Sequence, residues 1–215
     1  MAIKLSKEDI DWVLDRYPNM EYDRLNNQLF GELPFRREYQ GTLIADAYTV
    51  RVFLNHLDKH TKLPKVICES NKIGKIAKKY KIDIDDLHIN PDGTFCLAIE
   101  GEEKNFFKNE FTIQEFFINA IEGFLFQISY FNQYGSLPWG EYAHGYLGYI
   151  EKFASGTISI QELFSRLTKE ELAKALITNR QSKCLCGKGK KMRHCHPLVF
   201  QGISKMKQSQ YRIAL

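Results

Sequence analysis

The last part of the chain carries three cysteines and a histidine at spacings that strongly restrict how it can fold. One residue separates Cys184 from Cys186, eight residues separate Cys186 from Cys195, and Cys195 is followed directly by His196. Three thiolates and one imidazole at such short spacings suit a tetrahedral zinc site with no open position, which makes the metal structural. A segment this small cannot bury a core of its own, so we expect metal binding to supply its folding free energy.

Glycines and lysines fill the interval between the two ligand pairs. Gly187 and Gly189 are placed for the tight turn of a metal site, which favours a metal over a redox or disulfide pair. The stretch resembles the SEC-C motif, in which Cys-x-Cys-Gly-Ser-Gly-Lys-Lys precedes a Cys-His or Cys-Cys pair. Here Lys188 replaces the Ser and Met192 replaces the usual aromatic residue. The resemblance implies a docking role toward protein or nucleic acid. It also implies the ligands Cys184, Cys186, Cys195 and His196. His194 is left out of this set, although it could substitute for one of the ligands.

Charge is distributed unevenly along the chain. Eight of its 30 lysines and arginines lie in residues 183–215, which contain no Asp or Glu, so the other 22 are outnumbered by 26 acidic residues. A basic tail on a slightly acidic body predicts an acidic partner for the tail, either nucleic acid or protein.

A second stretch, residues 88–97, combines a sharp turn with a lone thiol. Pro91, Asp92 and Gly93 favour a tight bend, and residues 94–99 then read as a short strand. Cys96 therefore follows a bend, where its side chain can reach a surface groove. His88 and Asn90 belong to the opposite arm, close enough to face the thiol.

This stretch resembles the active-site segment of ubiquitin-conjugating enzymes, which carries His-Pro-Asn, a turn and Gly-x-hydrophobic-Cys-Leu. The matching residues are His88, Asn90, Gly93, Phe95, Cys96 and Leu97. The run Leu63-Pro64-Lys65-Val66 is similar to the family's Pro-Lys-Val element. The chain departs from the family in three ways. Ile89 stands where the family usually has Pro, and the spacing from Asn90 to Cys96 is two residues shorter than usual. The segment 71–87 is also longer than the corresponding connection in the family. Such departures resemble the divergent bacterial members that accompany antiphage CBASS operons.

The resemblance implies an acyl-transfer reaction that uses Cys96. A thiol is both a nucleophile and a leaving group, so it can hold a protein C terminus as a thioester and pass it to a lysine. The resemblance implies a cGAS-like nucleotidyltransferase as the partner that donates its C-terminal tail. It gives Asn90 the role of stabilising the oxyanion and His88 the role of bracing the loop. The chain shows no adenylating domain, so either another protein activates the donor or the donor reaches Cys96 already cleavable.

Two other interpretations of the same residues remain open. Free cysteines are among the most buried residues, so Cys96 is alternatively a strand cysteine without a catalytic role. The chain would then be a non-catalytic SEC-C docking or adaptor protein. It would be either a catalytically inactive relative with the same fold or an accessory protein of translation or secretion with an unrelated α/β domain. Cys68, on an expected strand, is interpreted as a small core residue.

The expected fold class is α+β, of the ubiquitin-conjugating-enzyme type, with an N-terminal helix, an antiparallel meander sheet and C-terminal helices. We expect a catalytic domain over residues 1–180 and a small zinc knuckle over residues 181–215. Ser6 caps the first helix, and residues 22–30 read as a second helical piece that Gly31 and Pro34 end. Strands are expected at residues 38–47, 48–55 and 63–68.

Helical patterns dominate the second half of the chain. A short exposed helix is expected within residues 75–81, and Thr112 opens an almost wholly apolar helix that ends at Gly135. Two short helices follow at residues 160–167 and 169–178, and residues 179–182 read as a linker. Residues 137–148 hold three aromatics and three glycines, which suggests either a loop that lines a donor groove or a packed core loop with His144 buried.

Composition bears on the compartment of the protein. The apolar content of 44% is ordinary for a globular chain, and no apolar run is long enough to span a membrane. The first residues lack the features of a signal peptide. Five cysteines of two different kinds argue for reduced thiols and a metal site. We therefore expect a cytoplasmic protein without a membrane partner.

Overall fold

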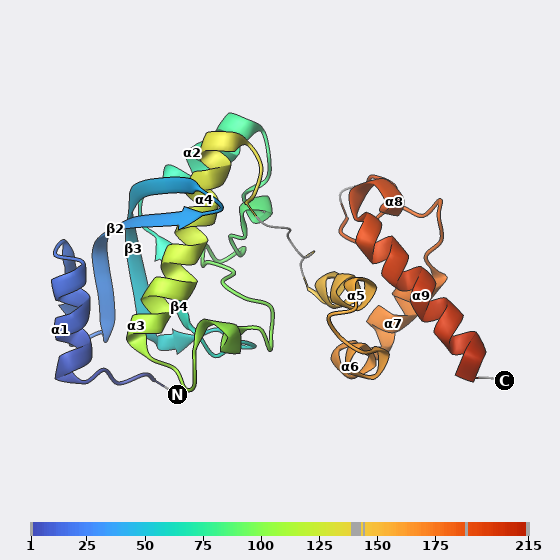
Figure 1. The fold of residues 1–215 in the computed structure, drawn as a ribbon, viewed down its shortest axis with the longest axis horizontal. Helices are drawn as coiled ribbons and strands as arrows, with labels where there is room; N and C mark the ends of the chain where they lie inside the picture. The colour runs from blue at the N-terminus through green and yellow to red at the C-terminus, as the bar shows by residue number, and fades with distance from the viewer. Residues whose placement is uncertain (1, 139–142, 144, 188, 214–215) are drawn as a thin grey trace. The chain divides into compact units, whose positions relative to one another are not determined.

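The computed structural model describes residues 2–138, 143, 145–187 and 189–213, and it divides the chain into two compact units. Met1–Trp139 forms the first unit and Gly140–Leu215 the second (Figure 1). The sequence predicted a boundary at residue 180. The division differs because the helices that follow residue 145 share a hydrophobic core with the cysteine-rich segment. Each unit is described by itself.

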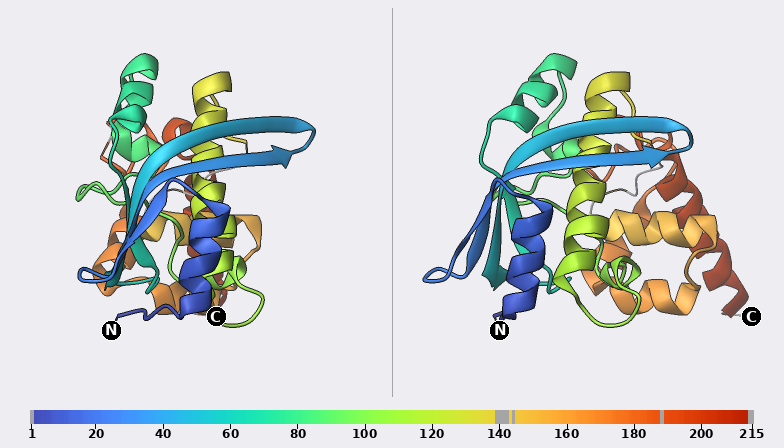
Figure 2. Two further views of the ribbon diagram at one scale, coloured as in Figure 1. Left: turned by 90° about the vertical axis from the view of Figure 1, so that its left-hand side faces the viewer. Right: turned by 60° about the vertical axis from the view of Figure 1, so that its left-hand side comes forward.

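The first unit contains a four-stranded antiparallel meander in the order β1-β2-β3-β4. Its strands are β1 (Met20–Asp23), β2 (Gln28–Tyr39), β3 (Thr42–Leu57) and β4 (Pro64–Cys68). The β2–β3 hairpin is paired continuously from Gln28↔Phe53 to Tyr39↔Thr42. Its tip extends beyond β1 and β4, which are short and pair only with the other end (Figure 2). The expected α+β class, with an antiparallel meander, is confirmed at this level.

The predicted helix at residues 22–30 is wrong, because this segment is the hairpin that joins β1 to β2. Gly31 and Pro34, read from the sequence as helix breakers, are strand residues of β2. Gly31 has a φ of +136°, and a Cβ there would lie 2.2 Å from the carbonyl oxygen of Asn19. Pro34 pairs with Ala47 in β3 beyond the end of β1, so its missing N–H leaves no ladder bond unmade on that side.

One long helix crosses the sheet on a single face and supplies much of the core (Figures 1 and 2). It begins at Thr112, whose hydroxyl accepts from the Glu115 amide, and ends at Gly135 as the sequence predicted. Along its length it comprises α3 (Ile113–Glu115), a π-helical turn (Phe116–Ile121) and α4 (Glu122–Tyr134). The guanidinium of Arg37, from β2, donates to the carbonyl of Ile118 within the π turn.

The N-terminal helix α1 (Lys7–Arg16) begins with the predicted capping box, in which Ser6 and Asp9 exchange hydrogen bonds. Beyond its C-terminal end the Tyr17 hydroxyl donates to Glu122 Oε1 at 2.7 Å, and Arg16 donates to the same oxygen at 3.1 Å. Glu122 is buried, so these two bonds compensate its desolvation. They fasten α1 to the crossing helix.

Helix α2 (Lys72–Tyr80) follows β4, close to the lysine-rich helix that the sequence predicted. Ile73, Ile76 and Ala77 bury one of its faces. Lys72 donates to the carbonyl of Ala47 at 2.9 Å and forms an ion pair with Asp46. The helix is therefore attached to β3 and is not a free charged arm.

The second unit is helical. Its helices are α5 (Tyr146–Ser155), α6 (Ile160–Arg166), α7 (Lys169–Ile177), α8 (Met192–Cys195) and α9 (Pro197–Ile213). The predicted caps Ser159 and Thr168 are both formed. At Gly202 of α9 a Cβ would lie 2.5 Å from the carbonyl oxygen of Ile150, so α5 and α9 pack at very close range. Across the described residues, no helix has both the length and the apolarity needed to cross a bilayer.

Candidate functional site

Residues 88–96 form a miniature hairpin at the edge of the sheet. Ile89 pairs with Phe95, and Thr94 pairs with Ile67 at the exposed edge of β4. The predicted turn closes through Gly93 N–H, which donates to the carbonyl of Asn90 at 2.8 Å. The Phe95 ring stacks on Phe124 of α4 at 4.3 Å, which anchors the hairpin in the core.

Cys96 is half-buried and lies directly across this hairpin from His88. Its backbone N–H donates to the carbonyl of His88 at 2.8 Å. Cys96 is more exposed than its two predecessors, Thr94 and Phe95, which are both buried. Cys96 is thus partly accessible to solvent and is not among the fully buried residues of the core.

His88 and Asn90 are both on the arm opposite Cys96, as the sequence predicted. His88 adopts a left-handed conformation, with φ +57°, and ends a 3-10 turn at Ile84–Leu87 by donating its N–H to the carbonyl of Asp85. Its backbone therefore sets the direction in which the chain enters the hairpin. The side-chain amide of Asn90 donates to Thr94 Oγ1 at 3.0 Å.

A chain of polar contacts continues from Thr94 to β4. Thr94 Oγ1 donates to Asp92 Oδ1 at 2.6 Å, and the other oxygen of Asp92 pairs with Lys65 Nζ at 2.6 Å. Hydrogen bonding from Lys65, followed by that from Thr94, lowers the pKa of Asp92 to about 2. Sequence reasoning missed Thr94 as a site residue. The sequence pattern that could have identified Thr94 is an Asp followed two positions later by a Thr. In this pattern the Asp side chain accepts a hydrogen bond from the backbone N–H of the Thr and closes a turn.

The second candidate site is the cysteine cluster. The ligand atoms of Cys184, Cys186, Cys195 and His196 all lie within 4.8 Å of one another. Cys184 Sγ is 3.1 Å from His196 Nδ1, and Cys186 Sγ is 3.5 Å from Cys195 Sγ. A tetrahedral cation with bonds of about 2.0 to 2.3 Å holds its ligand atoms roughly 3.3 to 3.8 Å apart. The four predicted residues are therefore arranged as a cluster that can bind a metal ion.

Local backbone structure assembles this cluster. The Cys184 N–H donates to the carbonyl of Lys190 at 2.7 Å, and Lys183 pairs with Lys191, which closes a small hairpin. Gly187 and Gly189 take φ values of +83° and +74° in its turn, the role that the sequence predicted for them. Cys195 and His196 follow at the end of α8. His194, which the sequence left out of the ligand set, is exposed and accepts a hydrogen bond from Arg193.

Burial governs the chemistry of these thiols. Desolvation raises the pKa of Cys184 to about 12 and also raises the pKa of Cys195. Without a cation both thiols would stay protonated at neutral pH, so metal binding has to displace their protons. Cys184 and Met192 also belong to the hydrophobic core formed by α5, α6, α7 and α9. The ligand cluster is therefore part of the core of the second unit.

The aromatic and glycine-rich stretch at residues 137–148 was predicted to be either a groove-lining or a core loop. Its central residues, 139–142 and 144, lie outside the described residues, His144 among them. Comparison of the chain with models of known protein families, with curated proteins and with solved structures finds no match.

Proposed function

We propose that this chain is a conjugating enzyme that carries a protein C terminus as a thioester on Cys96 and transfers it to a lysine. The observation that carries the proposal is the position of Cys96, half-buried at the sheet edge and paired across a tight hairpin with His88. The order of elements also supports it. An N-terminal helix, an antiparallel meander, the cysteine hairpin and a crossing helix occur in this order, with α2 between the meander and the hairpin. The same order is expected of the ubiquitin-conjugating type of fold.

The reaction needs a surface thiol and a polar group near the reacting carbonyl. The Cys96 thiolate attacks the activated carboxyl carbon of the donor, expels the activating group and forms the thioester. A neutral lysine amine then attacks the thioester carbonyl and loses a proton to solvent, and collapse of the tetrahedral intermediate releases the Cys96 thiolate and leaves an amide. The Asn90 amide has two N–H groups, so one can bind Thr94 while the other donates to the oxyanion.

The proposed donor is the C-terminal tail of a cGAS-like nucleotidyltransferase, and the proposed setting is regulation of antiphage signalling. Its carboxyl group would be activated by a separate protein. In the second unit we propose that the cation is zinc, bound by Cys184, Cys186, Cys195 and His196 in a closed structural site. Bound zinc would stabilise the fold of this unit. The exposed lysines beside it, Lys183, Lys190 and Lys191, would dock an acidic protein or nucleic acid.

Gel analysis without reductant tests the thioester. Purified protein is incubated with the nucleotidyltransferase, its activating protein and ATP, and we expect an adduct that dithiothreitol removes. Cys96→Ala should abolish the adduct, and Cys96→Ser should give an oxyester that resists dithiothreitol but not hydroxide. Cys68→Ser is the matched control, because Cys68 is a second half-buried thiol of the same unit. An adduct that survives in Cys96→Ala contradicts the proposal.

A second candidate function is a non-catalytic adaptor that docks partners through the second unit. The hydrogen bond from the Asn90 amide to Thr94 favours it, because this bond gives Asn90 a structural role in the turn. An adaptor would form no adduct with any donor. It would still bind its partner, and that binding would depend on Lys183, Lys190 and Lys191 and would be unaffected by Cys96→Ala.

A further inference from the structure

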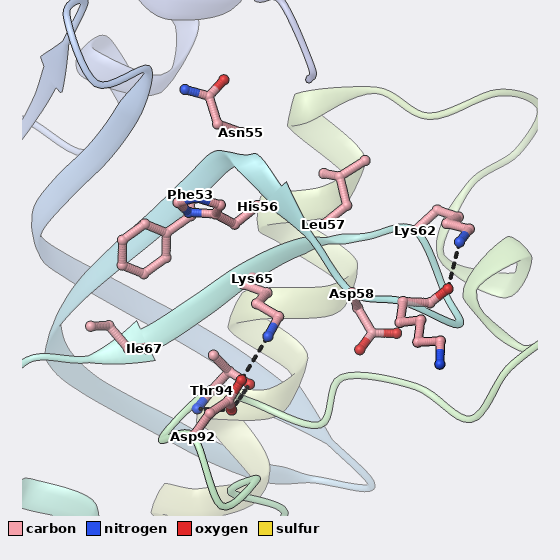
Figure 3. A pocket seen from close by; sticks show the side chains of 11 residues that line it. Phe53, Asn55, His56, Leu57, Asp58, Lys62, Lys65, Ile67, Asp92 and Thr94 are labelled. Atoms are coloured by element: carbon pink, nitrogen blue, oxygen red, sulfur yellow. Dashed lines mark hydrogen bonds and ion pairs between the residues drawn. The ribbon is translucent and has the colours of Figure 1, made fainter. Parts of the chain in front are cut away.

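A groove of about 880 Å³ opens between the β3–β4 end of the sheet and the hairpin that carries Cys96 (Figure 3). Phe53, Leu57 and Ile67 supply its apolar surface, and all three are half-buried. Asp92 and Thr94 of the hairpin form one end, and the loop from Asp58 to Lys62 lies at another (Figure 3). All of these residues belong to the first unit.

The groove exists because β3 bulges away from β4. Phe53 pairs with Lys65 and Leu57 pairs with Pro64, so β3 contains three residues, 54–56, that have no counterpart in β4. Asn55 and His56, both exposed, line the groove from this bulge. Bulges of this kind often adjoin functional sites, because they redirect side chains at a sheet edge.

Contacts from distant parts of the chain hold the bulge in place. The Leu54 N–H donates to the carbonyl of Asn27 at 3.2 Å, and the Leu54 carbonyl accepts from Ile3 at 2.9 Å. The Asn55 side chain accepts from Asn27 Nδ2 at 2.9 Å and donates to the carbonyl of Asn26 at 3.1 Å. The groove is therefore preformed, which lowers the entropy that an occupant must lose on binding.

The groove has an excess of positive charge. Its two acidic side chains are already engaged: Asp92 pairs with Lys65, and Asp58 Oδ1 accepts three hydrogen bonds from residues 60 and 61. Both carboxyl groups have lowered pKa values and stay ionised. Among the described residues, neither Lys59 nor Lys62 forms an ion pair with a carboxylate, and both are exposed. Lys62 Nζ donates to the carbonyl of Lys59, which positions its ammonium group on the loop.

The groove also lies next to the thiol along the chain. Thr94 lines it, and Cys96 is the second residue after Thr94 along the chain. Two extended residues span about 7 Å. A peptide whose carboxyl carbon reaches Cys96 would therefore have its preceding residues beside the groove.

We propose that this groove binds an extended acidic peptide, the segment that precedes the transferred carboxyl group of the acyl donor. Apolar side chains of the peptide would contact Phe53, Leu57 and Ile67, and carboxylates would face Lys59 and Lys62. The inference rests on the proposed function for the identity of the donor. The groove is basic and apolar, so it is complementary to a peptide that is acidic and apolar. This complementarity does not depend on any reaction at Cys96.

Fluorescence anisotropy tests the groove directly. The probe is a fluorescein-labelled ten-residue peptide that contains glutamates and leucines, and the matched peptide carries glutamine in place of every glutamate. Both are titrated with Cys96→Ala protein. We expect the acidic peptide to bind, its affinity to fall as salt is added, and the glutamine peptide to bind about tenfold more weakly. Equal binding of the two peptides overturns the proposal.

Charge-reversal variants locate the site. Lys59→Glu/Lys62→Glu should weaken binding of the acidic peptide by about tenfold or more, since two attractions become repulsions. Lys59→Glu alone leaves the Lys62 side chain in place, and it should weaken binding by about threefold even if the double variant folds poorly. Lys75→Glu/Lys78→Glu, on the exposed side of α2, is the control and should bind as wild type does. Wild-type affinity in both groove variants would overturn the proposal.

The proposal for the groove and the proposal for the conjugating function can be tested separately. Peptide binding that depends on Lys59 and Lys62 in a protein that forms no thioester supports the groove and contradicts the conjugating function. Thioester formation at the wild-type rate by Lys59→Glu/Lys62→Glu, at donor concentrations well below saturation, supports the function and contradicts the groove.

Discussion

Asn90 and Thr94 are joined twice across the turn that precedes Cys96. The backbone N–H of Asn90 donates to the carbonyl of Thr94 at 2.8 Å, and the side-chain amide of Asn90 donates to Thr94 Oγ1 at 3.0 Å. Asp92 accepts a further bond from the same hydroxyl. Thr94 therefore connects the residue proposed to stabilise an oxyanion with the wall of the adjacent groove.

Replacing Thr94 by Val should destabilise the first unit. The variant keeps the shape of the side chain but removes the acceptor of Asn90 and the donor to Asp92, and Thr94 is buried. We expect a loss of about 1 to 3 kcal/mol in the free energy of unfolding, measured by urea denaturation. Thr49→Val, on an exposed position of β3, is the control and should change the same quantity by less than about 0.5 kcal/mol.

The pairing of Asp92 with Lys65 predicts a dependence of stability on pH. In the folded chain the pKa of Asp92 is lowered from 3.8 to about 2, so the ionised form is favoured by folding. This contribution is complete above pH ~4 and is lost as the pH falls toward ~2. The Asp92 side chain is 50% exposed, so we expect less than about 1 kcal/mol. The difference in unfolding free energy between wild type and Asp92→Asn should shrink through this window, and a difference that grows instead would contradict the pairing.

Two glycine-to-alanine substitutions should act in opposite directions. At Gly202 a Cβ would meet the Ile150 carbonyl oxygen at 2.5 Å and its Cγ2 at 2.6 Å, so Gly202→Ala forces α5 and α9 apart and should cost about 1 to 3 kcal/mol. At Gly123 of α4 the nearest atom lies at 3.6 Å, an ordinary contact, so Gly123→Ala should stabilise its helix by about 0.5 to 1 kcal/mol. Thermal unfolding monitored by circular dichroism measures both. A stable Gly202→Ala would show that the two helices do not pack this closely.

If the second unit binds the proposed zinc ion, removal of that ion should unfold this unit and leave the first intact. Cys184 contributes both a ligand and a core contact, so chelation or Cys184→Ser should lower the helical signal and remove one equivalent of zinc by metal analysis. Thermal melting should then lose the transition of the second unit while that of the first stays. His194→Ala is the control, because His194 lies beside the cluster but is exposed. Zinc content that is the same in wild type and Cys184→Ser would exclude the site.

Sequence reasoning located elements whose signals are local. The Ser6 and Thr168 capping boxes, the cap at Thr112 and the helix end at Gly135 depend on a few adjacent residues, and all are formed. The four clustered ligands were also predicted, because short spacings bring them together whatever the rest of the chain does. The thioester, its donor and the zinc ion stay predictions.

Features that depend on distant partners were not predicted. Gly31 and Pro34 look like helix breakers until Asn19 and the short length of β1 are known, and these explain why both fit a strand. The strands predicted at residues 38–47 and 48–55 are one continuous strand for most of their length, because pairing with β2 carries β3 past Ala47. The groove depends on the bulge in β3, which only the pairing with β4 reveals.

The surplus of three residues in β3 also limits how this part of the chain can change in length. Side chains alternate along a strand with a period of two, so the loss of one residue from positions 54–56 would turn Leu57 and the start of the following loop to the opposite side. Loss of two residues would preserve that alternation and make the bulge shallower. Insertions or deletions of two residues here should therefore be tolerated better than those of one residue. In a library of length variants, the folding yield should be higher for changes of an even number of residues than for changes of an odd number.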